Sequence, residues 1–96
     1  MHRVVLKPRA VLMTKDAYDW YEVRSKGLGE IFLDELDKCI RKLQSNPAGS
    51  PKILKNYRQA KMKRFPYVVL FEIFKTDIVV LSVFHTKRNP KNRFKD

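Results

Sequence analysis

The chain has 96 residues, of which 44% are hydrophobic and 11% aromatic, and its 21 basic and 10 acidic side chains give a formal net charge of +11. This length and composition exclude a disordered polar tail and predict a single folded domain over residues 1–96. The domain is too small for a large enclosed catalytic cavity, so we expect any chemistry to lie on an open face.

Cysteine content and hydropathy limit where the protein works. The single cysteine, Cys39, excludes an internal disulfide framework and a cysteine-based zinc cage, and it suits a reducing compartment. The longest apolar runs, residues 67–71 and 78–83, are far shorter than the ~20 residues that span a bilayer, and no signal peptide is visible. We therefore expect a soluble, cytoplasmic protein without a membrane partner.

The positive charge is concentrated in the second half of the chain. Residues 49–96 contain 12 basic and 3 acidic side chains, a net charge of +9, whereas residues 1–48 contain 9 basic and 7 acidic ones. A surface with this excess attracts phosphate backbones or an acidic protein partner.

The first half of the chain has the pattern of a short strand followed by two helices. Residues 4–6 are an apolar run that predicts a strand, and Pro8 suits the first position of a helix that continues over about residues 10–24. The glycine-rich turn at residues 27–29 predicts a break before a second helix over about residues 28–45. Apolar residues at spacings of three and four indicate an amphipathic helical hairpin. The predicted stripes are Ala10, Met13, Ala17, Trp20, Tyr21 and Arg24 in the first helix and Leu28, Phe32, Leu36, Cys39, Ile40 and Leu43 in the second.

The second half changes to the pattern of strands. A loop over residues 46–51 precedes three predicted strands at residues 57–64, 67–74 and 78–84. The last strand is apolar on both faces, so we place it near the centre of the sheet. The order β-α-α-β-β-β predicts an α+β fold in which the helical hairpin packs on one face of a mainly antiparallel sheet.

No local signature of a cofactor or metal site is present. The chain has no glycine-rich phosphate loop, no metal-spaced histidine pair and no Cys/His or Ser/His/Asp signature, so we expect no cofactor and no metal. The carboxylates Asp34, Glu35 and Asp37 fall close to Lys38 and Arg41 and predict a solvated helix face.

A cationic patch is the main candidate site. If the last strands form a meander, Lys61, Lys63 and Arg64 meet Arg88 near one end of the sheet, and alternation along the strand puts Lys61 and Lys63 on one side. His85 ends the last strand, and two roles are open to it: a general base kept neutral by nearby cations, or a hydrogen-bonding cap of the sheet. With His85 as base and the cations stabilising charge on phosphorus, the patch could cleave RNA without a metal. The same cations could instead hold an acidic protein without any reaction.

Several motifs, taken in order, resemble a known family. They are Lys7-Pro8-Arg9-Ala10, Tyr18-Asp19-Trp20-Tyr21, Gly27-Leu28-Gly29 with the helix start that follows, Asn46-Pro47, Lys63-Arg64-Phe65-Pro66-Tyr67, the strand that ends at His85, and Arg88-Asn89-Pro90. Over about residues 3–94 their order and spacing resemble the RelE/ParE toxins of bacterial type II toxin–antitoxin systems. The resemblance implies a small toxin of the plasmid-stabilisation type, encoded beside an antitoxin that wraps and neutralises it.

The resemblance also implies a choice between two targets. RelE-like members cut messenger RNA on the translating ribosome, and ParE-like members inhibit DNA gyrase. The glycine turn, the Arg64-Phe65-Pro66-Tyr67 segment and the His-x-x-Arg-x-Pro ending are more similar to the ParE branch. Gyrase inhibition is therefore the expected activity. A ribosome-dependent mRNA endoribonuclease is the alternative, and a non-catalytic RNA-binding module is a further alternative.

The resemblance assigns roles to individual residues. Basic groups of RelE-like nucleases match the strand segment around Lys61 and the residues after His85, whereas the C-terminal tyrosine of those enzymes has no counterpart, because Phe94 lacks a hydroxyl. The catalytic set of a nuclease would be His85, Lys61, Lys63, Arg64 and Arg88. The predicted target-binding residues are Lys61, Lys63, Arg64, Lys87, Arg88, Arg93 and Phe94.

An antitoxin is the second expected partner. A positively charged toxin with an exposed helical hairpin suits an acidic segment that folds on binding. We expect Tyr18, Leu28 and Ile31 to contribute the apolar part of that contact.

Overall fold

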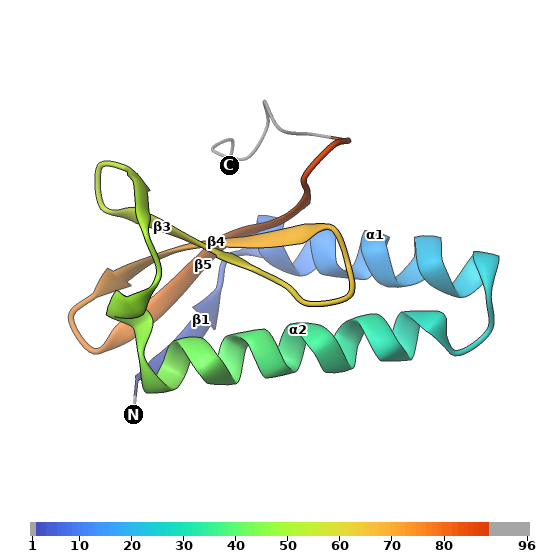
Figure 1. Cartoon of the computed structure of the whole chain (residues 1–96), viewed down its shortest axis with the longest axis horizontal. Coiled ribbons are helices and arrows are strands. Elements are labelled where there is room, and N and C mark those ends of the chain that lie inside the picture. The colour runs from blue at the N-terminus through green and yellow to red at the C-terminus, as the bar shows by residue number, and fades with distance from the viewer. Residues whose placement is uncertain (1, 89–96) are drawn as a thin grey trace.

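A helical hairpin and a five-stranded sheet form two layers in the computed structural model, which describes residues 2–88 (Figure 1). The α+β fold predicted from the sequence is confirmed, with one additional short strand. The elements are β1 (Arg3–Leu6), α1 (Pro8–Arg24), α2 (Leu28–Ser45), the 3-10 turn η1 (Pro47–Gly49), β2 (Lys52–Leu54), β3 (Tyr57–Lys61), β4 (Tyr67–Phe74) and β5 (Asp77–His85). Within residues 2–88 no helix has the length and apolar character needed to cross a membrane.

The sheet has the strand order β1-β5-β4-β3-β2. The β1 strand runs parallel to β5, and the other three pairs are antiparallel. As predicted, β5 is an inner strand. Its register against β4 steps from Ser82 to Val80, so Leu81 is the extra residue of a β-bulge. Because of this bulge, Val80 and Val83 both pack into the helix-facing core although they are three residues apart.

Two groups of buried residues lie on the strands. The larger group joins the helices to the sheet and includes Ala10, Tyr21, Phe32, Leu36, Val69, Phe71 and Val83. The second group contains Val68, Leu70, Leu81 and Phe84, with Met13 and Tyr57 packed against it. Both faces of β4 and β5 are therefore buried, which explains why these strands are apolar throughout.

Local capping explains where the helices begin. Pro8 occupies the first turn of α1, where its missing N–H costs nothing, and Lys7 offers no side-chain cap. Gly27 directly precedes the second helix, and its φ of 90° lies in the left-handed region that favours glycine. The Glu22 carboxylate at the end of α1 accepts hydrogen bonds from the backbone N–H groups of Gly27 and Gly29. This carboxylate fixes the turn between the two helices, since it satisfies donors that a helix start leaves free.

Gly29 packs closely against Tyr18 of α1, and we expect Gly29→Ala to lower the free energy of unfolding by about 1–3 kcal/mol. An added Cβ would lie 2.7 Å from a ring carbon of Tyr18 and 2.8 Å from the Tyr18 carbonyl oxygen, and the carbonyl cannot move without shifting α1. The better helix propensity of alanine, about 1 kcal/mol, only partly offsets this.

Urea denaturation of both variants measures the effect. The matched control is Gly27→Ala, whose Cβ has no neighbour within 4 Å and which carries only backbone strain, about 1 kcal/mol. A Gly29→Ala protein as stable as the original would show that the helices can separate freely.

Parts of the predicted elements differ from the structure. Residues 52–54, to which the sequence assigned no element, form the edge strand β2, which is too short to have a pattern of its own. The strand predicted over residues 57–64 ends at Lys61, because the chain bends into a segment where Arg64 has a φ of 70°. Trp20, expected in the packed stripe, remains 38% exposed.

Candidate functional site

The strand register places the predicted basic residues at one end of the sheet. Lys61 pairs with Val68, Tyr67 pairs with His85, and the Met62 N–H donates to the Tyr67 carbonyl oxygen at 3.0 Å. The segment after β3 and the end of β5 therefore lie beside the same end of β4. We call the residues Lys61, Lys63, Arg64, Lys87 and Arg88 the cationic end of the sheet.

Arg88 is held by aromatic residues of α1 and β4. Its guanidinium carbon lies 4.5 Å from the centre of the Trp20 ring, and Nη2 donates to the Tyr67 hydroxyl oxygen at 2.5 Å. A second guanidinium, that of Arg24, lies 3.2 Å from the same indole ring and donates to the Trp20 carbonyl. Two cations thus share one exposed indole, an arrangement that the ring's negative face stabilises. Trp20 and Arg24 are four residues apart on a helix, a spacing that could have indicated their contact.

His85 caps the turn that follows β5. Its Nδ1 accepts hydrogen bonds from the backbone N–H groups of Lys87 at 3.0 Å and Arg88 at 3.2 Å. A backbone N–H can only donate, so Nδ1 carries no proton and a neutral ring carries its proton on Nε2. This geometry favours the capping role over the general base, because neither ring nitrogen can take a proton while the turn is intact.

The protonation of His85 should therefore weaken the fold. Burial, followed by the charges of Arg88 and Lys87, lowers the pKa of His85 below its ordinary value of 6.5. The unfolded chain then binds more protons, so the free energy of unfolding falls as the pH drops below about 6.5. His85→Asn keeps an acceptor near the same place but does not titrate, and we expect its stability to change less between about pH 7.5 and pH 5.5. Urea titrations of both proteins test this, and equal pH dependence would contradict it.

The prediction that Glu35 lies on a solvated helix face is wrong. The side chain is buried, with the residue only 6% exposed, and its Oε2 lies 3.5 Å from both Arg64 Nη1 and Lys38 Nζ. Asp34 and Asp37 are exposed and form ion pairs with Lys38 and Arg41, as expected of a solvated face. The Glu35–Arg64 pair ties the segment after β3 to α2, so one cation of the proposed patch is already paired, although its side chain remains 66% exposed.

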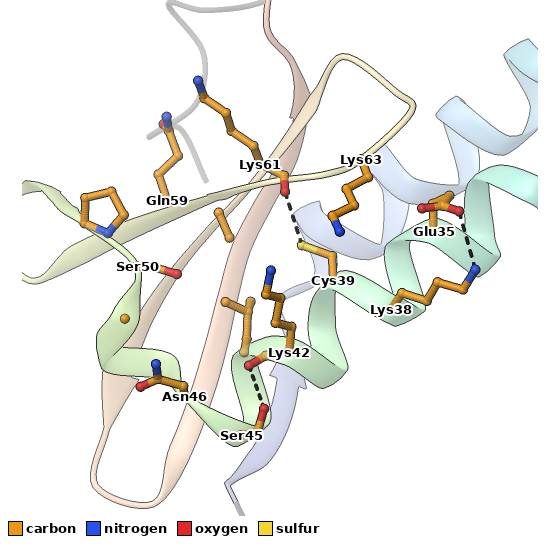
Figure 2. Close-up of a pocket in the computed structure, with 14 residues that line it drawn as sticks. Glu35, Lys38, Cys39, Lys42, Ser45, Asn46, Ser50, Gln59, Lys61 and Lys63 are labelled. Carbon is orange, nitrogen blue, oxygen red and sulfur yellow. Dashed lines mark hydrogen bonds and ion pairs between the residues drawn. The ribbon is translucent and has the colours of Figure 1, made fainter.

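Lys61 and Lys63 do not share one side of a strand. The strand ends at Lys61, and Lys63 lies in the bend that follows, where side chains no longer alternate. Figure 2 shows the Lys61 side chain turned away from α2 and the Lys63 side chain turned toward it. Both residues border a groove of about 680 Å³ between the C-terminal half of α2, the η1 region and β3, which we call the α2–β3 groove.

The residues predicted for antitoxin contact occupy different environments. Tyr18 lines a shallow hollow of about 470 Å³ formed by α1, α2 and the end of β1, and its hydroxyl donates to Glu30. Ile31 is exposed, whereas Leu28 packs against the core. The hollow also contains Val11, which is 52% exposed and which the sequence analysis missed. Val11 is an apolar residue outside the predicted stripe of the first helix, and this was the signal that could have found it.

Two predicted target-binding residues, Arg93 and Phe94, lie outside the described residues. Lys87 is exposed, and its backbone N–H binds His85. In the part of the chain that the structure describes, no three histidine, cysteine or acidic residues are placed so that they could hold a metal ion.

Comparison with known proteins decides the family. Residues 4–90 match the family model described as the ParE toxin of the type II toxin–antitoxin system, parDE. This chain belongs to the ParE toxin family. The membership confirms the RelE/ParE resemblance read from the sequence and makes the chain a toxin of a type II toxin–antitoxin system. No curated protein matches its sequence.

Solved structures agree with this fold. One chain of the "Chromosomal ParDE TA system from P. aeruginosa" superposes with a TM-score of 0.79 at 17% identity, over 88% of this chain and 96% of that one. A chain of the "intact E. coli RelBE toxin-antitoxin complex" gives a TM-score of 0.68 at 15% identity, over 92% and 100% of the two chains. At these identities the likeness concerns the fold, and the nature of the target has to be argued from the site.

Proposed function

We propose that this ParE-family toxin acts in the cytoplasm by inhibiting DNA gyrase through a protein–protein contact made by the cationic end of the sheet. The observation that carries the proposal is the family match over nearly the whole chain. The basic side chains exposed at this end of the sheet, Lys61, Lys87 and Arg88, attract an acidic protein and can bind it without any bond being made or broken.

The arrangement of the polar groups also favours binding over RNA cleavage. The candidate base, His85, uses Nδ1 to cap a turn, and the candidate phosphate ligand Arg64 is paired with Glu35. The phenol beside His85 is that of Tyr67, a buried residue. Burial raises the pKa of this phenol, so it stays protonated at neutral pH and is unsuited to accept a proton. A nuclease would have to rearrange all three groups.

We propose further that an antitoxin encoded nearby covers the hollow on the helical hairpin. The hollow contains the apolar side chains of Leu6, Val11 and Leu33, and Val11 is more than half exposed. Such a surface suits the apolar face of a partner helix. Both similar structures come from toxin–antitoxin systems, which supports an antitoxin as the partner.

A supercoiling assay with purified gyrase tests the main proposal. Adding the full chain should inhibit supercoiling of relaxed plasmid, and a complex with the antitoxin should not. Unchanged supercoiling at a large molar excess of toxin would reject gyrase as the target.

One observation favours a second function, that of a ribosome-dependent endoribonuclease. Arg88, Tyr67 and His85 lie together, and a cation beside a phenol and an imidazole is a combination suited to phosphoryl chemistry. Primer extension on translated messenger RNA would then show cuts within codons. If His85→Ala retained full cleavage, the histidine could not be the base.

A further inference from the structure

We infer that the α2–β3 groove is a binding site for an extended acidic peptide segment of a partner protein. The site lies apart from the hollow on the helical hairpin, and the inference does not depend on gyrase being the target. It rests on the shape of the groove, on two ammonium groups that point into it, and on the chemistry of its lining.

The charges of the groove are unbalanced. Figure 2 shows Lys42, from the last turn of α2, and Lys63, from the bend after β3, with both side chains turned into the groove that Cys39 also lines. Neither lysine forms an ion pair within residues 2–88, whereas Lys38 at the border of the groove is neutralised by Asp34 and Glu35. Two unpaired cations that face one space create a positive potential, which a ligand carboxylate would lower.

Cys39 is one of the residues that line the groove. It is a free, half-buried thiol whose Sγ lies 3.9 Å from the Lys61 carbonyl oxygen. Burial raises the pKa of the thiol, and the Lys42 charge opposes that rise, as expected of a thiol beside a cation. Because the chain has one cysteine, a reaction at this thiol reports on this groove alone.

The lining favours a peptide over a nucleic acid. Among the described residues, those that border the groove include aliphatic Leu43 and Ala60 and several polar groups, but no aromatic ring. Single-stranded nucleic acid is usually held by stacking of its bases on aromatic side chains, which this groove does not offer. A volume of about 680 Å³ suits a short extended segment with carboxylates for the lysines and small apolar side chains for the floor.

Binding of a defined probe to the full chain tests the inference. The probe is a short fluorescein-labelled peptide of alternating glutamate and leucine, and its binding is followed by fluorescence anisotropy. We expect the double variant Lys42→Gln/Lys63→Gln to bind it about tenfold more weakly, since two charge contacts are lost. The control is Lys7→Gln/Lys26→Gln, which removes the same charge from exposed positions outside the groove and should change the affinity less than twofold.

Alkylation of Cys39 by neutral iodoacetamide locates the bound peptide without any variant. The acidic peptide should slow the reaction, and a peptide with glutamine in place of glutamate should not. Oligothymidylate, as a nucleic-acid probe, should also leave the rate unchanged. Equal loss of binding in the two double variants, peptide binding without protection of Cys39, or stronger protection by oligothymidylate would each overturn the inference.

Discussion

Arg88→Ala is expected to weaken the inhibition of gyrase about thirtyfold, the effect of losing an interface arginine worth about 2 kcal/mol. Arg88 belongs to the cationic end of the sheet, and its position is set by the Trp20 ring at 4.5 Å and by the Tyr67 hydroxyl. A guanidinium held in this way loses little conformational freedom on binding, so its contacts contribute more to affinity than those of a free surface lysine. The measurement is the toxin concentration that halves supercoiling.

Two variants separate the role of Arg88 from a general loss of charge or of folding. Arg3→Ala removes the same charge at the opposite end of β5, where Arg3 forms an exposed ion pair with Asp77, and should leave inhibition nearly unchanged. Arg88→Lys keeps the charge but not the planar group that packs on the indole, so it should be intermediate.

The fluorescence of Trp20, the one tryptophan of the chain, reports directly on this contact. It should change in Arg88→Ala and not in Arg3→Ala. If the two alanine variants inhibit gyrase equally, the cationic end of the sheet is not the contact surface.

Phe32→Ala is expected to lower the free energy of unfolding by about 3–5 kcal/mol, a large part of the ~5–15 kcal/mol that stabilises a typical domain. Phe32 is fully buried, and its ring contacts those of Tyr21, Phe65 and Tyr67 at centroid distances of 5.6, 5.3 and 5.0 Å. Removing the ring leaves a cavity between α2 and the segment that carries Arg64. The loss is measured by urea or guanidinium denaturation.

The control for this prediction is a smaller change at the same position. Phe32→Leu keeps most of the volume and should cost less than about 1.5 kcal/mol. Leu12→Ala, at an exposed position of α1, should cost less than about 0.5 kcal/mol. A Phe32→Ala protein that unfolds at nearly the original urea concentration would show that this aromatic cluster is not the centre of the core.

Some features of this protein follow from local sequence alone. The bounds of α2 were predicted to the residue, since Gly27 must adopt a left-handed conformation and Asn46-Pro47 cannot continue a helix. The bounds of β4 were also predicted, because an apolar run between turn residues has few alternatives. The family followed from several short motifs in fixed order, and the family match confirms it.

The arrangement of the site residues depends on contacts between segments that are distant in the sequence, and a local sequence pattern does not predict such contacts. Sequence periodicity placed Glu35 on a solvated face, but the Arg64 side chain approaches it from the bend after β3 and makes a buried carboxylate tolerable. Trp20 was assigned to the core by spacing, yet the chain after β5 brings Arg88 to its ring. Alternation predicted one side for Lys61 and Lys63, and the end of β3 between them separated the two. Local rules fix backbone conformation and which residues are apolar, whereas the pairing of charges and rings depends on how the layers pack, and that was decided by the tertiary structure.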